Sequence, residues 1–336
     1  MPHLSCSTSQ TRRTLMRRAA GFTLTAVATP YAQLASAADP SWLSERSIKF
    51  LVPFPAGGGA DIAARMIAQA IGLKLGQPIV VDNKAGAGGA VGSQSVQTAR
   101  ADGYTLLVGS ADTHSIYPHV YTRPIFQAQE FTAVAPITRI AYVLMGRPGL
   151  PAKNARELVT MASKGKLSYA SWGAGSAAHA AMCMFMGAAD LTDMLHVPYA
   201  GSAPAVQGLM GSQVDLMMVP MPLAVANRSR LTVFGVSALA RIEAIKDVPT
   251  LAEQGYVVDA NFWIGLLGPA KMPAAPVAAI SVRVMEAVGS SEVQEKLLGL
   301  GMVPHLLTQP EFASYVSSEY SRWGQVIRTA GIKIDQ

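Results

Sequence analysis

The sequence is poor in cysteine, in charge and in long apolar runs, and each shortage excludes a class of protein. Its 336 residues include two cysteines, Cys6 and Cys183, and only 14% of them are charged. Cys6 lies in an N-terminal segment that we expect to be removed, so Cys183 has no partner for an intramolecular disulfide. No apolar run reaches the roughly 20 residues that span a bilayer. These shortages exclude a disulfide-stapled domain and an integral membrane protein.

Residues 1–37 have the pattern of an export signal. A cationic stretch, TRRTLMRR, precedes a short apolar stretch, AAGFTLTAVATPYAQLA, and the small residues Ala35 to Ala37 follow. The pair Arg12 and Arg13 is similar to a twin-arginine signal, but Leu15 and Arg17 stand where Phe and Lys are favoured, so Sec export stays open. We expect cleavage near Ala37 and a product in the periplasm.

The basic excess of the chain lies mostly in this signal. The full chain has 27 basic and 21 acidic residues, a net charge of +6. Four arginines and no acidic residue lie in the signal, which leaves 23 basic against 21 acidic residues, or +2. A nucleic-acid-binding surface is therefore not expected.

Short apolar runs alternate with amphipathic stretches along the rest of the chain. Eight runs predict strands: IKFLV, PIVVDN, YTLLVGS, KLSYAS, LHVPY, VDLMMV, LTVFGVS and FWIGLLGP. This alternation is typical of an α/β fold and predicts parallel sheets with helices on both faces. Asp61 is the predicted N-cap of the first helix, and SEVQ from Ser291 and TQPE from Thr308 fit capping boxes.

Two apolar, extended segments flanked by prolines, Ala135 to Gly149 and Ala260 to Pro273, predict crossings between two domains. The first domain would then comprise residues 38–140 plus 262–336, and the second residues 141–261. A ligand in such a protein lies in the cleft outside the carboxyl ends of the strands.

Two glycine-rich loops invite a phosphate interpretation, which the residues around them contradict. PFPAGGGADIAARM, from Pro53, has no lysine after its glycines, and Asp61 would repel a phosphate at the helix start. AGAGGAVGS, from Ala85, has Val91 where the dinucleotide fingerprint requires glycine. We therefore expect no nucleotide and no other cofactor.

A third loop, SWGAGSAAHAAM from Ser171, resembles a nucleophile elbow, but Tyr169 replaces its first glycine. We favour Ser176 as a helix N-cap and His179 as a side chain bonded to backbone, and a hydrolase using Ser171 or Ser176 with His179 stays the alternative from another class. His114 and His119 do not share a helix face, so no metal site is expected.

Loops rich in Gly, Ser and Thr at helix starts remain: AGGGAD, GSADTH, SWGAGS and AGSAPA. Each offers backbone N–H donors beside the positive end of a helix dipole. Several such ends converging on a cleft predict a site for a small carboxylate that uses no arginine clamp.

The sequence resembles the substrate-binding proteins of tripartite tricarboxylate transporters, the Bug family. The resemblance rests on seven ordered motifs over the whole mature chain: VPFPAGGGADIAARMIA, VVDNKAGAGGAVGSQSV, ADGYTLLVGS, SWGAGSAAH, HVPYAGSAPAVQGLMGSQVDLM, VPTLAEQGY and FWIGLLGPAKMP. It implies a type II periplasmic binding fold, in which two hinged α/β domains close over a small ligand. It also implies a receptor, expected to be a monomer, that delivers an organic acid to integral membrane permease subunits.

The resemblance also implies the ligand-binding residues. In this family main-chain groups and waters of the first loop hold the ligand carboxylate, and the second domain completes the site. Carried onto this chain, the first side comprises Phe54, Ala56, Gly57, Asp61, Gly109, Ser110 and Thr113. The second side comprises Ser171, Trp172, Gly173, Gly175, Ser176, His179, Tyr199 and Ala203.

Five positions depart from the family pattern. Ala60 replaces a frequent Thr, Trp172 a frequent Ser or Ala, and Ala200 a common Lys, while Asp112 and Tyr117 interrupt a stretch usually richer in Asn and Thr. A bulkier and less cationic cleft follows, with Phe54 and Trp172 about an apolar ligand body, which favours a monocarboxylate or an aromatic acid over a citrate-like ligand. A periplasmic sensor that presents its closed form to a signalling protein is the alternative within the binding class.

Overall fold

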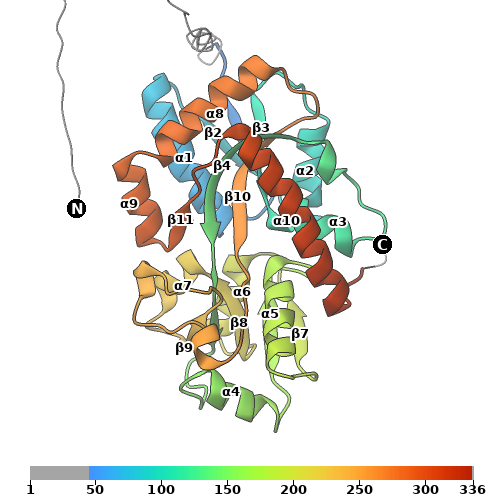
Figure 1. The fold of residues 1–336 in the computed structure, drawn as a ribbon, viewed down its shortest axis with the longest axis vertical. Helices are drawn as coiled ribbons and strands as arrows, with labels where there is room; N and C mark the ends of the chain where they lie inside the picture. The colour runs from blue at the N-terminus through green and yellow to red at the C-terminus, as the bar shows by residue number, and fades with distance from the viewer. Residues whose placement is uncertain (1–44, 335–336) are drawn as a thin grey trace, which may run out of the picture. The chain divides into compact units, whose positions relative to one another are not determined.

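The computed structural model describes residues 45–334, and the predicted export signal lies outside them. The described chain forms two mixed β-sheets, each contacted by helices (Figure 1). No helix within residues 45–334 is both long enough and apolar enough to cross a membrane.

The six-stranded sheet has the order β11-β4-β10-β3-β1-β2. Its strands are β1 (Lys49–Val52), β2 (Val80–Asn83), β3 (Thr105–Ser110), β4 (Thr132–Ile140), β10 (Phe262–Gly268) and β11 (Met302–Pro304). β1 pairs in parallel with β2 and β3, whereas β10 is antiparallel to β3 and β4.

The five-stranded sheet has the order β7-β6-β8-β5-β9. Its strands are β5 (Tyr142–Gly146), β6 (Ser168–Ser171), β7 (Leu195–Pro198), β8 (Leu216–Pro220) and β9 (Thr232–Val236). β6 is parallel to β7 and β8, and β5 is antiparallel to β8 and β9. The prediction of parallel sheets is therefore wrong for part of each sheet. The reason lies in the crossings: β4 leaves the first sheet toward the second and β10 returns, so the two strands run in opposite directions.

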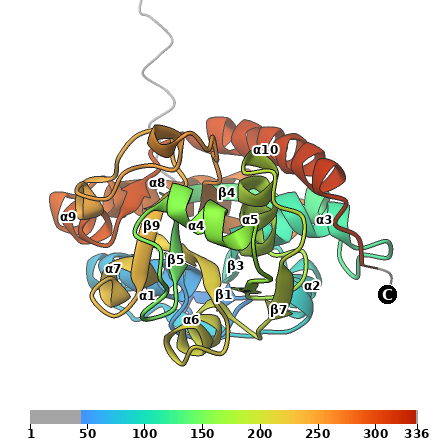
Figure 2. The same ribbon diagram turned by 90° about the horizontal axis from the view of Figure 1, so that it is seen from below.

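Helices follow most strands and cover the sheets. They are α1 (Gly59–Leu75), α2 (Ala90–Gln97), α3 (Tyr117–Val120), α4 (Ala155–Ala162), α5 (Ala177–Ala188), α6 (Ser202–Met210), α7 (Met221–Asn227), α8 (Ala274–Val288), α9 (Ser291–Gly299) and α10 (Gln309–Ala330), with a π-helix η4 (Asp112–Ile116) and a 3₁₀-helix η3 (Ala87–Gly89). In Figure 2, α6 and α10 lie on opposite sides of the molecule.

The helix starts refine the predicted caps. Gly58, not Asp61, is the N-cap of α1, and Asp61 lies in the first turn. Ser290 rather than Ser291 caps α9, through a bond from the Val293 N–H. The capping box of Thr308 is confirmed. Both corrections have one cause: the N-cap is the last residue with extended backbone, and apolar periodicity does not locate that residue to the exact position.

The chain passes between the sheets at two neighbouring points. Ala141 alone separates β4 from β5, and the chain re-enters the first sheet at Phe262. At this passage the rings of Tyr142 and Phe262 stack with centroids 5.2 Å apart and planes 9° apart. The exact domain boundaries stay a prediction.

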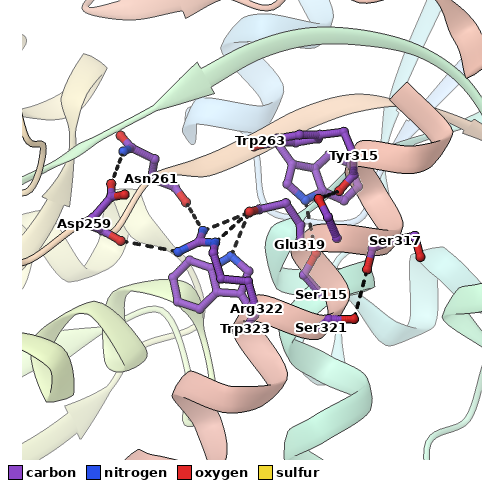
Figure 3. Close-up of polar contacts among 11 residues, drawn as sticks. Ser115, Asp259, Asn261, Trp263, Tyr315, Ser317, Glu319, Ser321, Arg322 and Trp323 are labelled. Atoms are coloured by element: carbon purple, nitrogen blue, oxygen red, sulfur yellow. Dashed lines mark hydrogen bonds and ion pairs between the residues drawn. The ribbon is translucent and has the colours of Figure 1, made fainter. Parts of the chain in front are cut away.

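The C-terminal helix holds the returning segment by polar contacts (Figure 3). Arg322 on α10 pairs with the buried carboxylate of Glu319 and donates to the carbonyl of Asn261 at 3.2 Å. Its guanidinium also donates to the carbonyl of Asp259 at 3.4 Å. The Trp323 indole N–H donates to Glu319, so the buried carboxylate is fully paired. This network ties α10 to the segment that enters β10.

Candidate ligand-binding cleft

A cavity of about 390 Å³ is bordered by loops from both sheets. On one side lie the loops that follow β1 and β2, and on the other those that follow β6, β7 and β8. Within each sheet the loops lie together, because the carboxyl ends of neighbouring parallel strands lie at the same sheet edge. The volume falls within the range of small-molecule sites.

The loop after β1 brings the start of α1 to the cavity. Phe54, Ala56, Gly58 and Gly59 line it, and no side chain caps the helix at Gly58. The first N–H groups of a helix have no intrahelical acceptor, so this end offers donors and a positive dipole.

Asp61 fixes this loop from behind and does not line the cavity. Its buried carboxylate accepts bonds from the Gly57 N–H at 3.0 Å, from the Asn83 amide at 3.0 Å and from Arg65 at 3.1 Å. Burial raises the pKa of Asp61, but the bonds from Arg65, Gly57 and Asn83 outweigh it and hold the pKa below its usual value. The Asp61 carboxylate is therefore paired with groups of the protein and does not face the cavity.

The second glycine-rich loop, residues 85–89, forms another part of the wall. Gly89 has φ of 94°, and a Cβ there would lie 2.7 Å from the Thr113 methyl carbon. Only glycine meets both conditions. This loop lacks the residues of a nucleotide motif and is not part of the site predicted from the sequence.

Residues 199–203 approach the first loop from the other sheet. Tyr199, Ser202 and Ala203 line the cavity, and α6 begins after Gly201 without a side-chain cap. A Cβ on Gly201 would lie 3.0 Å from the Pro55 ring. The two loops are therefore in close contact across the cleft, and α6 presents a second open helix start to it.

Trp172 and Asp112 close the cavity near the passage between the sheets. The Trp172 ring packs against Tyr142 at 5.7 Å, and its indole N–H donates to Asp112 Oδ1 at 3.2 Å. The Ala177 N–H, in the first turn of α5, donates to the same oxygen at 2.7 Å. Burial raises the pKa of Asp112 to about 6, against the lowering effect of these two bonds.

The structure brings together only part of the predicted site. Phe54, Ala56, Trp172, Gly173, Tyr199 and Ala203 line the cavity. Gly175 and Ser176 border a small adjoining pocket that also touches Asp112 and Trp172. Neither lining includes Gly57, Asp61, Gly109, Ser110, Thr113, Ser171 or His179. The binding roles of all fifteen residues stay predictions.

Residues near the end of β3 support the loops from within the core. Ser110 and Thr113 are fully buried, and the Ser110 N–H donates to the Thr113 hydroxyl at 3.2 Å. That hydroxyl also lies 2.8 Å from His114 Nδ1. A Cβ on Gly109 would lie 2.4 Å from Leu267. These residues therefore pack under the site.

The serine and histidine residues adopt a structural arrangement, as the favoured interpretation predicts. The Ser176 hydroxyl accepts the His179 N–H as a helix cap, and His179 Nδ1 accepts the Gly175 N–H at 3.0 Å. The Ser171 hydroxyl donates to the Gly173 carbonyl at 2.8 Å and accepts the Gly173 N–H at 3.2 Å, and it lies 2.7 Å from His196 Nε2. Burial, then the neighbouring His196, lowers the pKa of His179 to about 4.

The cavity contains few charges. Among the residues that the structure describes, no Lys, Arg or His lines it, and Asp112 is the one acidic residue that does. Among residues 45–334, no three His, Cys, Asp or Glu side chains come together as a metal site. Backbone donors at helix starts and aromatic faces are what the cleft offers a ligand.

The predicted site left out these residues that line the cavity: Pro53, Pro55, residues 58–60, the loop at residues 85–89, Asp112, residues 200–202, Pro220 and Phe262. The second glycine loop had a usable signal, because it follows a predicted strand as the first loop does. Asp112 was noted only as a departure from a pattern. Pro220 and Phe262 carried no signal, since their place depends on how the two sheets meet.

A family model and a solved structure each match most of this chain. The model of the TctC family, described as "Tripartite tricarboxylate transporter family receptor", matches residues 63–332. The periplasmic binding protein BugD is 29% identical with a TM-score of 0.81, over 87% of this chain and 99% of that one.

Two solved relatives carry ligands in their descriptions. Rpa4515 of R. palustris, described with adipate, is 27% identical with a TM-score of 0.84 over 87% of this chain and all of that one. MatC of Rhodopseudomonas palustris, described with bound malate, is 30% identical with a TM-score of 0.78, over 84% of this chain and 99% of that one.

Proposed function

The chain belongs to the tripartite tricarboxylate transporter receptor family, and on that premise we propose that it captures a small organic acid in the cleft and delivers it to the permease subunits of such a transporter. The family consists of transporter receptors, so the chain is a solute-binding protein and not an enzyme. Its α/β fold with two mixed sheets is that of periplasmic binding proteins.

One observation carries the proposal for a carboxylate ligand. The starts of α1 and α6 both reach the cavity with glycine N-caps and without a side-chain cap, although no cationic side chain of the described residues lines it. Uncapped helix starts bind anions through N–H groups and the helix dipole, each contact contributing roughly 0.3 to 2 kcal/mol. The relatives described with adipate and with malate are described with carboxylates.

The finer parts of the proposal concern location and mechanics. We place the protein in the periplasm after cleavage near Ala37, with two hinged domains that close over the ligand. BugD, named as a periplasmic binding protein, supports this location. The contact of residues 199–203 with the first loop supports a closed conformation, and Phe54 and Trp172 supply apolar surface for the ligand body.

The test is a ligand screen on the exported protein. Native mass spectrometry of protein purified without refolding identifies any retained ligand, and a thermal-shift screen then covers mono-, di- and tricarboxylates, including adipate and malate. A ligand at a hundred times its Kd adds about 2.7 kcal/mol to the free energy of unfolding. If no carboxylate raises Tm, the proposed function is wrong.

A further inference from the structure

The electrostatics of the cleft are unusual for a site proposed to take acids. Within residues 45–334, Asp112 is the single formally charged side chain that lines the cavity, and its charge has the sign of the ligand carboxylate. Glycine-capped helix starts border the same cavity, so it offers donors in one part and an acceptor in another.

Asp112 is held so that one oxygen remains available. The residue is only 6% exposed, and its Oδ1 accepts both the Ala177 N–H and the Trp172 indole N–H. No residue of the described chain, 45–334, donates to Oδ2, although the residue borders the cavity. Within residues 45–334, Oδ2 is not one of the buried side-chain atoms that lack a partner. It is therefore accessible from the cavity that Asp112 borders, where a donor on a bound ligand can reach it.

The described part of the chain places no cationic side chain in the cavity lining to neutralise this carboxylate. The Tyr142 phenol interacts electrostatically with Asp112, and burial raises its pKa well above 10, so that group stays neutral. The Tyr142 hydroxyl is buried and has no hydrogen-bond partner within residues 45–334. A cationic group on a ligand would fill the role that no side chain fills.

We propose that Asp112 selects among organic acids, and that the cleft takes a carboxylate whose second functional group is a hydrogen-bond donor, above all a protonated amine, and disfavours dicarboxylates. This inference rests on the proposed function, since it assigns the second half of the same ligand. The helix starts of α1 and α6 receive the carboxylate, and Asp112 Oδ2 receives the donor. A dicarboxylate would bring a second negative charge against Asp112 with no lysine or arginine to offset it.

Matched ligand probes test this choice. In each probe set one carboxylate is kept and the other end varies: adipate, ε-aminocaproate and caproate form an aliphatic set, and terephthalate, para-(aminomethyl)benzoate and para-toluate form an aromatic one. Isothermal titration calorimetry at pH 8 measures each Kd for wild type and for Asp112→Asn. Asp193→Asn is the matched control, because it removes the same charge at a side chain that is 72% exposed and does not line the cleft.

The expected result is a preference that depends on Asp112. In at least one set, wild type and Asp193→Asn bind the amino acid at least about tenfold more tightly than the dicarboxylate, and Asp112→Asn removes or reverses this ratio. Equal or tighter binding of the dicarboxylates by wild type, or an unchanged ratio in Asp112→Asn, overturns the inference and leaves the proposed function intact. If no member of either set binds and the wider carboxylate screen also fails, both the proposed function and this inference are wrong.

Discussion

The starts of α1 and α5 have similar local structure, but they differ in whether their N–H groups are open to a ligand. Each follows a strand and a glycine-containing loop at the cleft. The start of α1 has a glycine N-cap and no side-chain cap, whereas α5 is capped by Ser176 and receives Asp112 on the Ala177 N–H. One helix start is therefore open to an external anion, and the other already holds an anion of the protein. The same local motif becomes a binding site or a structural support according to what the rest of the chain brings to it.

The comparison extends to the two carboxylates beside these helices. Asp61 is surrounded by donors that lower its pKa, whereas burial raises the pKa of Asp112. The first charge stabilises the folded loop, and the second is costly to the folded state. Costly buried charges are typical of sites selected for function rather than for stability.

Placing a negatively charged cap at the open start of α1 should give the largest effect, a loss of ligand affinity. Gly58→Asp places a carboxylate at the N-cap of α1, where φ of −82° and ψ of 170° suit any residue. Carboxylate affinity should fall about a hundredfold or more, because like charges in a desolvated site repel strongly.

Two measurements separate this repulsion from crowding. A Cβ at Gly58 lies 3.0 Å from the Ser202 hydroxyl, so Gly58→Ala shows the effect of bulk alone, and Gly58→Asn shows a cap without charge. Calorimetric Kd values for the ligand found in the screen should show that Gly58→Asp binds it much more weakly than Gly58→Ala or Gly58→Asn. Equal losses in all three variants would show that α1 does not hold the carboxylate.

Neutralising Asp112 should stabilise the protein without ligand. Because its pKa is raised from 3.8 to about 6, the folded state binds the proton more tightly, and the free energy of unfolding falls as pH rises from about 4 through about 6. Asp112→Asn keeps an acceptor for Trp172 and Ala177, so it should gain up to about 3 kcal/mol at pH 8 and nothing at pH 4. Urea unfolding at both pH values measures this, and a gain of equal size at pH 4 would contradict the assigned cause.

Neutralising Asp61 should lower the free energy of unfolding, which is the opposite of the effect expected at Asp112. Its pKa is lowered in the folded state, so its contribution is present above the ordinary pKa and is lost as pH falls through the folded value. Asp61→Asn should cost about 2 kcal/mol at pH 7, since charge-assisted bonds to Gly57 and Arg65 are lost. The same urea series, extended to pH 3, should show the two stability curves converging. A constant difference would mean that packing, not charge, fixes the loop.

Removing the Ser176 cap should have the smallest effect. The Ser176 hydroxyl accepts the His179 N–H at 3.4 Å. Another N–H in the first turn of α5, that of Ala177, donates to Asp112 and does not depend on Ser176. Ser176→Ala should lower the free energy of unfolding by about 1 kcal/mol and leave ligand affinity within about twofold. A loss of ligand affinity far beyond this would move Ser176 from support to direct contact.

Much of the local structure could be predicted from residue patterns. Each of the eight apolar runs predicted as strands contains or overlaps an observed strand, as with Thr105–Ser110 inside YTLLVGS. The strands β4, β5 and β11 lie outside these runs and were not predicted as strands. The passage near residue 140 followed from an apolar extended segment between prolines. The caps were less exact, because an N-cap depends on one backbone conformation rather than on a periodic pattern.

The site was harder to predict because it is made where loops distant in the sequence meet. Phe54 and Trp172 were found through the family resemblance, and both line the cavity. Ser110 and Thr113 belong to the same motifs yet are buried beneath it. Phe262 lines the cavity only because β10 returns beside the passage at Tyr142, a consequence of sheet order that no local pattern contains.

The sequence by itself determined the α/β character, the family and the absence of the nucleotide motifs, because these depend on residue type, period and spacing along the chain. Only the tertiary structure decided which helix start is open, which carboxylate is buried and which charge faces the cavity. Asp61 and Asp112 are the same residue type beside similar helices, and three donors around one and burial around the other give them opposite pKa shifts. A carboxylate's charge state depends on its neighbours in space, and those neighbours are set by packing between distant segments.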